Sequence, residues 1–261
     1  MNYDGKHRAH QSMDGAVPRR AFLVGGILAA GAAFGVQGMT GQPPQRTVRP
    51  PGARAEEEGS GDRRPRTSRD ARRASATVPL IYRTEQWGAE APDRDASVRR
   101  RPPKYIIVHH TATDNVDDYS LSRAQRLARA IQNVHKEQGW GDTGQHLTIS
   151  RGGHILEGRT GSIAAVERGE MVVGTHVRGA NDVAVGIECE GTYNTVLPPR
   201  RLRESLVEVC VWLCEQYDLN PHEAIMPHRK FNDTDCCGDK FAPTLPDLRD
   251  DVAGMLPSKL R

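Results

Sequence analysis

Three side chains that can bind a transition metal stand at widely separated positions in the chain. They are His109 in "YIIVHHTATD", His228 in "MPHRKF" and Cys236 in "TDCCGDKF". Two imidazoles and one thiolate are an accepted ligand set for a catalytic zinc ion that keeps its fourth position open. Such an ion lowers the pKa of bound water to about 7 and polarises a carbonyl oxygen, and hydrolysis of an amide needs both. The spacing matches none of the short zinc-protease motifs, so taken alone it is also compatible with three unrelated histidine and cysteine side chains.

The elements that must position these residues alternate between strand-like and helix-like patterns. "YIIVHHT" is a short apolar run typical of a buried strand, and its neighbouring residues His109 and His110 must point to opposite faces. Apolar residues at helical spacing predict helices over 120–138, 202–217 and 245–256. Residues 146–150 and 154–159 flank Gly152-Gly153 as a hairpin, and 182–191 alternates like a strand. Strands interleaved with helices predict an α/β domain with a mixed central β-sheet flanked by α-helices.

The N-terminal third has a different composition. Arg19-Arg20 precede a Gly- and Ala-rich apolar stretch that is too short for a permanent span, so residues 1–38 are predicted to be an export signal of the twin-arginine type or an N-terminal anchor. Residues 39–78 are rich in Pro, Arg and Ser with few large apolar residues, which predicts a disordered linker. The folded domain is expected over 79–261, and the protein is expected outside the cytoplasmic membrane or associated with the cell wall.

Charge and cysteine content limit the partners and the covalent structure. A formal net charge of +3 is too small to indicate nucleic acid as a partner. Five cysteines leave at least one unpaired, and with Cys236 reserved for a metal the other four form two disulfides or remain buried thiols. A bridge from the helix carrying Cys210 and Cys214 to Cys237 or Cys189 is the preferred alternative.

Five blocks of the chain resemble one family in their order and spacing. The blocks are "RTEQWGAE", "YIIVHHTAT", "GWGDTGQHLTISRGGHILEGR", "GTHVRGANDVAVGIECEG" and "PHRKFNDTDCCG". They are similar to the zinc-dependent type 2 N-acetylmuramoyl-L-alanine amidases and the related peptidoglycan recognition proteins, over about residues 79–256. The resemblance implies a single domain of the peptidoglycan-recognition fold that acts on muropeptides in the cell wall.

The resemblance also implies roles for single residues. His109, His228 and Cys236 would bind zinc, Glu188 would be the catalytic carboxylate and Thr234 would assist the oxyanion. Glu188 could instead be a strand-edge carboxylate paired with an arginine, with Glu190 next in line as the base, and Thr234 could merely cap the turn before Cys236. His110 would pack beneath a helix.

Further residues are implied to line a substrate groove. They are Gln145, His146, Arg159, His176 and Asn181. The alternatives are an internal salt bridge for Arg159 and loop hydrogen bonds for His176 and Asn181. Gln145 stands where many members carry Tyr, and because a Gln amide cannot take a proton at neutral pH, Glu188 would have to act as the general base on the zinc water. Cys237 replaces the usual proline after the cysteine ligand.

Three functions follow from these residues. The first is an exported, monomeric zinc amidase that cuts the bond between N-acetylmuramic acid and L-alanine, with no membrane partner beyond an N-terminal anchor. The second is a peptidoglycan-binding module without catalysis; Cys236 argues against it, because recognition-only relatives usually lack the thiolate, whereas Gln145 argues for it. The third is an adaptor with a structural zinc, which would need His146 or His176 as a fourth protein ligand.

Overall fold

The computed structural model describes residues 78–260, and the predicted export segment and all but the last residue of the predicted linker lie outside this range. Six strands form one sheet in the order β1-β5-β4-β7-β3-β8. Their bounds are Ile81–Tyr82 (β1), Ile155–Glu157 (β5), Leu147–Ile149 (β4), Ala184–Cys189 (β7), Tyr105–His110 (β3) and Ile225–Pro227 (β8). Only β4 and β5 pair antiparallel, so the predicted mixed sheet is confirmed. Val98–Arg99 (β2) and Met171–Val172 (β6) form a separate antiparallel pair.

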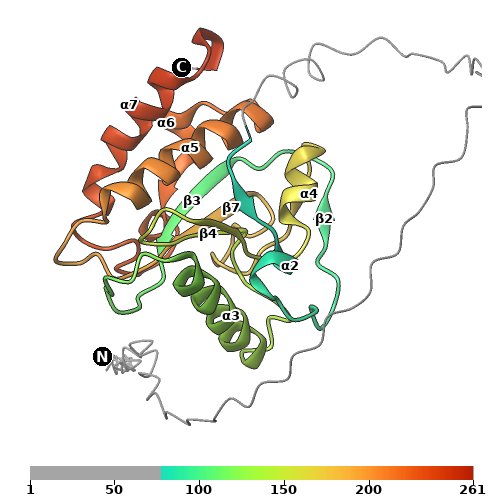
Figure 1. Cartoon of the computed structure of the whole chain (residues 1–261). Helices are drawn as coiled ribbons and strands as arrows, with labels where there is room; N and C mark the ends of the chain where they lie inside the picture. Colours follow the sequence, from blue (N-terminus) through green and yellow to red (C-terminus); the bar gives the residue numbers. More distant parts are fainter. Residues whose placement is uncertain (1–77, 261) are drawn as a thin grey trace, which may run out of the picture. The chain divides into compact units, whose positions relative to one another are not determined.

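Helices cover both faces of the sheet (Figure 1). The helices are Thr84–Trp87 (α2), Leu121–Glu137 (α3), Ser162–Glu167 (α4), Arg200–Tyr217 (α5), Pro221–Ala224 (α6) and Leu245–Met255 (α7), with short 3-10 turns at His228–Lys230, Ala242–Thr244 and Ser258–Leu260. The helix bounds agree with the predicted 120–138, 202–217 and 245–256 within two residues. Among the described residues, no helix is both long enough and apolar enough to cross a membrane.

The two faces of the sheet carry different kinds of side chain. On the face covered by α5 and α7, Ile106 and Val108 of β3 join Leu206 and Leu248 in the main apolar core. On the opposite face, Leu156 of β5 packs against α2 and α3. Ile107 of β3 lies on that second face with Val177, Ala180 and Ala184, so the segment between β6 and β7 covers this part of the sheet. The alternation along β3 therefore places His109 on the same face as Ile107.

His110 points to the main core, as the alternation predicts. Its Nδ1 accepts a hydrogen bond from the main-chain N–H of Tyr193 at 3.2 Å. Burial, together with the nearby Arg229 guanidinium, lowers the pKa of His110 to about 4. A neutral ring that satisfies a main-chain donor has a structural role, since such a donor is costly to leave unpaired.

The five cysteines are buried free thiols. The preferred prediction of a disulfide from the helix of Cys210 and Cys214 to Cys237 or Cys189 is therefore wrong for this structure. These four side chains all belong to the apolar core that α5 and α7 share with the sheet. The physical reason is that a small apolar thiol satisfies a core position without a bridge, and the spacing of cysteines in a sequence cannot distinguish the two states.

Glu190, directly after β7, links the sheet to α3. Its side chain is fully buried and accepts hydrogen bonds from Arg123 Nε at 3.1 Å and from the main-chain N–H of Arg151 at 2.9 Å. Arg151 in turn donates through Nε to the carbonyl oxygen of Val116 at 2.8 Å. These bonds fix the loop between β3 and α3 relative to the end of β7.

Replacing Glu190 tests this link. Glu190→Ala leaves the guanidinium of Arg123 and a buried main-chain N–H without their acceptor, so we expect a loss of about 2–3 kcal/mol in the free energy of unfolding, measured in urea. The matched control is Glu204→Ala, which removes an exposed ion pair with Arg200 and is expected to cost less than about 1 kcal/mol. Equal effects of the two substitutions would contradict the structural role of Glu190.

Candidate metal centre

His109, His228 and Cys236 converge from three different segments. His109 lies near the end of β3, His228 begins the 3-10 turn after β8, and Cys236 lies in the loop that follows. Each offers one ligand atom, and the three atoms all lie within 4.8 Å of one another. His109 Nδ1 is 3.1 Å from His228 Nδ1 and 3.7 Å from Cys236 Sγ. The structure thus brings together the three residues that the sequence analysis assigned to a metal.

The far nitrogen of each imidazole is held by a partner of its own. His228 Nε2 lies 2.9 Å from Asn232 Oδ1, and His109 Nε2 lies 2.9 Å from His176 Nδ1. Asn232 is oriented in turn, because its Oδ1 accepts from the main-chain N–H of Arg178 and its Nδ2 donates to the carbonyl oxygen of the same residue. An imidazole that binds a metal through one nitrogen usually donates its other N–H to such a partner.

Burial keeps the metal-free ligands uncharged. Desolvation, followed by the neighbouring histidines His176 and His228, lowers the pKa of His109 well below its usual value. Burial also lowers the pKa of His228 and raises the pKa of the Cys236 thiol. Neutral imidazoles have a free lone pair for a metal, whereas the thiol must lose its proton when an ion binds. Two nitrogens and one sulfur within bonding reach of a common point fit zinc.

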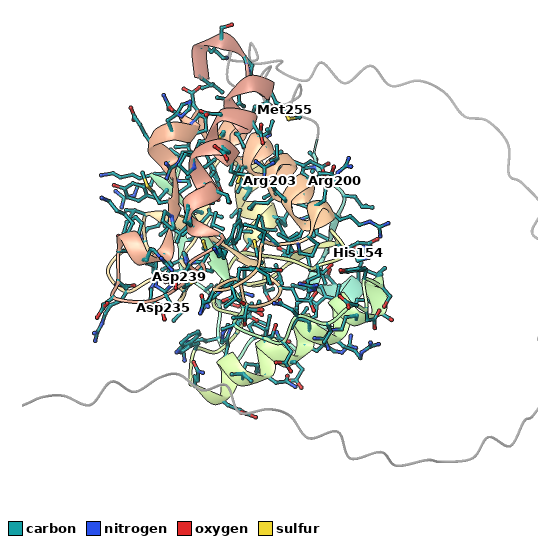
Figure 2. The ribbon with its side chains drawn as sticks, turned by 90° about the vertical axis from the view of Figure 1, so that its left-hand side faces the viewer. His154, Arg200, Arg203, Asp235, Asp239 and Met255 are labelled. Atoms are coloured by element: carbon teal, nitrogen blue, oxygen red, sulfur yellow. The ribbon has the colours of Figure 1, made fainter. Side chains whose placement is uncertain are left out.

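The loop that carries Cys236 is fastened by Arg229. The guanidinium donates through Nε to the carbonyl oxygen of Cys236 at 3.3 Å and through Nη2 to Asp239 Oδ1 at 2.9 Å. The main-chain N–H of His110 also points at Cys236 Sγ, at 3.3 Å. Figure 2 shows Asp235 and Asp239 together at one edge of the molecule, well apart from Arg203 and Met255 on the α5 and α7 side. Arg229 and the main-chain N–H of His110 therefore hold Cys236 against the end of β3.

Glu188 lies on the strand next to that of His109. In the register of the parallel pair β3 and β7, His109 is directly opposite Glu188, and Thr148 of β4 is opposite Glu188 on the other side. Paired residues on neighbouring strands are about 4.8 Å apart and point to the same face. No hydrogen bond or ion pair to the Glu188 carboxyl group is found among the described residues, so the predicted pairing with an arginine does not occur there. Glu190, by contrast, has the arginine partner described above.

The environment of Glu188 favours its protonated form when no cation is present. Burial raises the pKa of Glu188 to about 8. A nearby cation acts in the opposite sense and favours the carboxylate. The charge of this group should therefore depend on the occupancy of the adjacent metal centre.

Three residues predicted to contact substrate are buried in the structure. The exposed fractions are 0% for Gln145, 2% for His146 and 6% for Arg159. Gln145 Nε2 donates to Thr148 Oγ1 at 2.9 Å. The ring of His146 accepts from the main-chain N–H of Gly186 through Nδ1 and donates from Nε2 to the carbonyl oxygen of Val172.

Arg159 forms no salt bridge with any residue that the structure describes. Its guanidinium donates to the carbonyl oxygens of Thr143 at 2.9 Å and Trp140 at 3.1 Å. Like His146, Arg159 therefore bonds main-chain groups, whereas Gln145 bonds a side-chain hydroxyl. The buried polar backbone around β4 and β5 requires such partners.

Three other predicted residues lie nearer the metal centre. Thr234 Oγ1 accepts from the main-chain N–H of Cys236 at 3.3 Å, which is the capping alternative, and its side chain is partly exposed. Asn181 Oδ1 accepts from the main-chain N–H groups of His176 and Val177, which is the loop-bonding alternative. His176 is partly exposed and contacts His109 directly.

One residue of the site, Asn232, was missed from the sequence. It stands four positions after His228, a spacing that brings two side chains together when the intervening turn is helical. Residues 228–230 form such a turn. The spacing of His and Asn in "HRKFN" was the available signal.

Comparisons with known proteins agree with this geometry. The family described as "Amidase_2: N-acetylmuramoyl-L-alanine amidase" matches residues 99–239. Peptidoglycan-recognition protein LB of Drosophila melanogaster is 30% identical over 167 residues, which are 64% of this chain and 67% of that protein. Human N-acetylmuramoyl-L-alanine amidase is 30% identical over 166 residues, which are 62% of this chain and only 27% of that protein.

A solved structure has the same fold. It is a Drosophila PGRP-LB mutant in complex with tracheal cytotoxin, at 27% sequence identity and a TM-score of 0.55, covering 63% of this chain and 92% of that chain.

The raised pKa of Glu188 predicts a specific dependence of stability on pH. In the metal-free fold the group keeps its proton up to about pH 8, whereas an ordinary carboxyl group loses it above 4.5. The fold therefore binds one more proton than the unfolded chain in this range, and its stability falls as the pH rises from about 4.5 to about 8.

Glu188→Gln removes this contribution while the histidines stay the same. We expect the Tm of Glu188→Gln minus that of the native chain, both measured in chelator, to increase steadily from pH 5 to pH 8. A difference that does not change with pH would mean that Glu188 is ionised throughout this range in the folded protein.

Proposed function

The chain belongs to the N-acetylmuramoyl-L-alanine amidase family, and we propose that it hydrolyses the amide bond between N-acetylmuramic acid and L-alanine in peptidoglycan. The observation that carries the proposal is the convergence of His109, His228 and Cys236 beside Glu188 on one face of the sheet. A zinc ion held by the three ligands would supply a Lewis acid that activates water and polarises the carbonyl oxygen of the scissile amide.

An open coordination position favours catalysis over a structural metal. A closed site would need a fourth protein ligand, and His146 and His176 were the predicted candidates. Both ring nitrogens of His146 are occupied by main-chain groups. His176 turns its Nδ1 to His109 Nε2, on the side of that ring away from His228 and Cys236. Three protein ligands would leave the fourth position of a tetrahedral zinc ion for water or substrate.

In the proposed reaction Glu188 transfers protons. The ionised carboxylate accepts a proton from the attacking water and then returns it to the departing nitrogen, so one group serves as base and then as acid. Its raised pKa in the metal-free fold suits the second step, and the adjacent cation suits the first. The Thr234 hydroxyl, two residues before Cys236, would donate a hydrogen bond to the oxygen that gains negative charge.

The burial of Gln145 bears on the alternative of a recognition module without catalysis. Gln145 is fully buried and donates to Thr148 Oγ1, and a Gln amide cannot take a proton at neutral pH. The proposed mechanism does not need it, since Glu188 supplies the base from the neighbouring strand. The peptidoglycan substrate lies outside the cytoplasmic membrane, which is consistent with the export signal that we propose for residues 1–38.

Digestion of purified peptidoglycan tests the proposal. The full chain loaded with zinc is expected to release stem peptides with a free L-alanine N-terminus, identified by mass spectrometry, and a chelator should abolish the release until zinc is added back. Glu188→Gln should keep its zinc and lose turnover by about 10²–10⁴-fold. Glu204→Gln, on the exposed surface of α5, is the matched control and should be as active as the native chain.

Two results would contradict the proposal. Binding of one zinc with retention of the wall material but no cleavage would indicate a recognition module. Full activity of Glu188→Gln would mean that another group transfers the proton.

A further inference from the structure

The ring of His176 occupies a slot that two glycines make possible. A Cβ atom on Gly186, in the middle of β7, would lie 2.5 Å from His176 Nδ1, and one on Gly174 would lie 2.7 Å from His176 Cδ2. Neither distance is sterically allowed, so an alanine at either position would displace the imidazole or the backbone. The reason for glycine at 186 is this close approach, because the residue lies in a regular strand.

The hydrogen bonds of His176 define which of its nitrogens carries the proton. Nε2 lies 3.3 Å from the carbonyl oxygen of Ala184, and because a carbonyl oxygen only accepts, Nε2 must donate. A neutral imidazole then has its lone pair on Nδ1, which lies 2.9 Å from His109 Nε2. The main-chain N–H of His176 is held by Asn181 Oδ1 at 2.8 Å, so both the ring and its backbone are fixed.

The same reasoning extends one residue further. Since His176 Nδ1 accepts, His109 Nε2 must carry the proton of the His109 ring. The lone pair of His109 is then on Nδ1, the atom that faces His228 Nδ1 and Cys236 Sγ. The carbonyl group of Ala184 thereby determines, through two rings, which nitrogen of His109 is available to a metal.

We propose that His176 is a positioning residue that fixes the ring orientation and the tautomer of His109 for zinc, in addition to any contact with substrate. The inference rests on the proposed function, because it takes zinc as the ion at the three-ligand centre. Asn232 performs the equivalent task for His228, with its amide oxygen 2.9 Å from His228 Nε2. His176 thus belongs to the metal centre, whereas the sequence analysis placed it in the substrate groove.

Zinc affinity, measured by competition with a chelator on the full chain, tests the proposal without a substrate. His176→Phe keeps an aromatic ring for the slot but has no acceptor for His109 Nε2, and we expect the Kd for zinc to rise about 10–100-fold. His176→Gln keeps an amide oxygen that can accept from the same N–H, and its Kd should lie closer to the native value. Should the Phe variant fail to fold, as judged by its Tm in chelator, His176→Leu takes its place with the same expectation.

The matched control is His135→Phe. His135 is also a partly buried histidine, its Nδ1 accepts from the main-chain N–H of Gly144 at 3.0 Å, and its ring packs against Trp140. This substitution should lower the Tm and leave the Kd for zinc unchanged.

The results of these measurements distinguish a failure of the positioning role from a failure of the proposed function. A native Kd for zinc in folded His176→Phe, with reduced cleavage of peptidoglycan, would overturn the positioning role and return His176 to the substrate groove. A native chain that binds no zinc at all would overturn the proposed function itself. A weakened Kd in His176→Phe together with a near-native Kd in His135→Phe supports the positioning role, whatever the rate of cleavage.

Discussion

The parallel pairing of β3 with β7 is the constraint on which the site depends. Its register sets His109 opposite Glu188, and the strict alternation of side chains sends both to the face that α5 and α7 do not cover. A shift of β3 by one residue against β7 would turn His110 toward that face and bury His109 in the core. The apolar residues Ile106 and Val108 oppose such a shift, because both would leave the core together.

The candidate metal centre combines one ligand on a β-strand with two ligands in a segment that hydrogen bonds hold in place. His109 belongs to a central strand, whereas His228 and Cys236 follow β8 at the edge of the sheet and depend on Arg229 and Asn232 for their positions. The burial that lowers the pKa of His109 and raises that of the Cys236 thiol favours the uncharged forms of both side chains when no cation is bound. A bound cation would favour the charged forms, because it stabilises both the Cys236 thiolate and the Glu188 carboxylate.

Local patterns in the sequence were sufficient to predict the fold and the convergence of the three candidate ligands. Apolar periodicity predicted the helices at 121–137, 200–217 and 245–255 within two residues, and the family motifs selected His109, His228 and Cys236, which lie close together in the fold although far apart in the chain. The burial of Gln145, His146 and Arg159 could not be predicted, because a polar residue in a motif looks the same whether it faces a groove or a buried polar group of the protein. The role of His176 was also hidden, since it depends on Gly186 and Ala184, whose distances from His176 arise only in the folded chain.

The proposed metal centre holds one zinc ion through these three side chains and leaves one coordination position open. X-ray absorption at the zinc edge of the zinc-loaded full chain measures this coordination shell. We expect one sulfur at about 2.3 Å, two imidazole nitrogens at about 2.0–2.1 Å and one further light atom from solvent. A shell without sulfur, or one with three imidazoles and the thiolate, would contradict it, because the first removes Cys236 and the second closes the site to substrate.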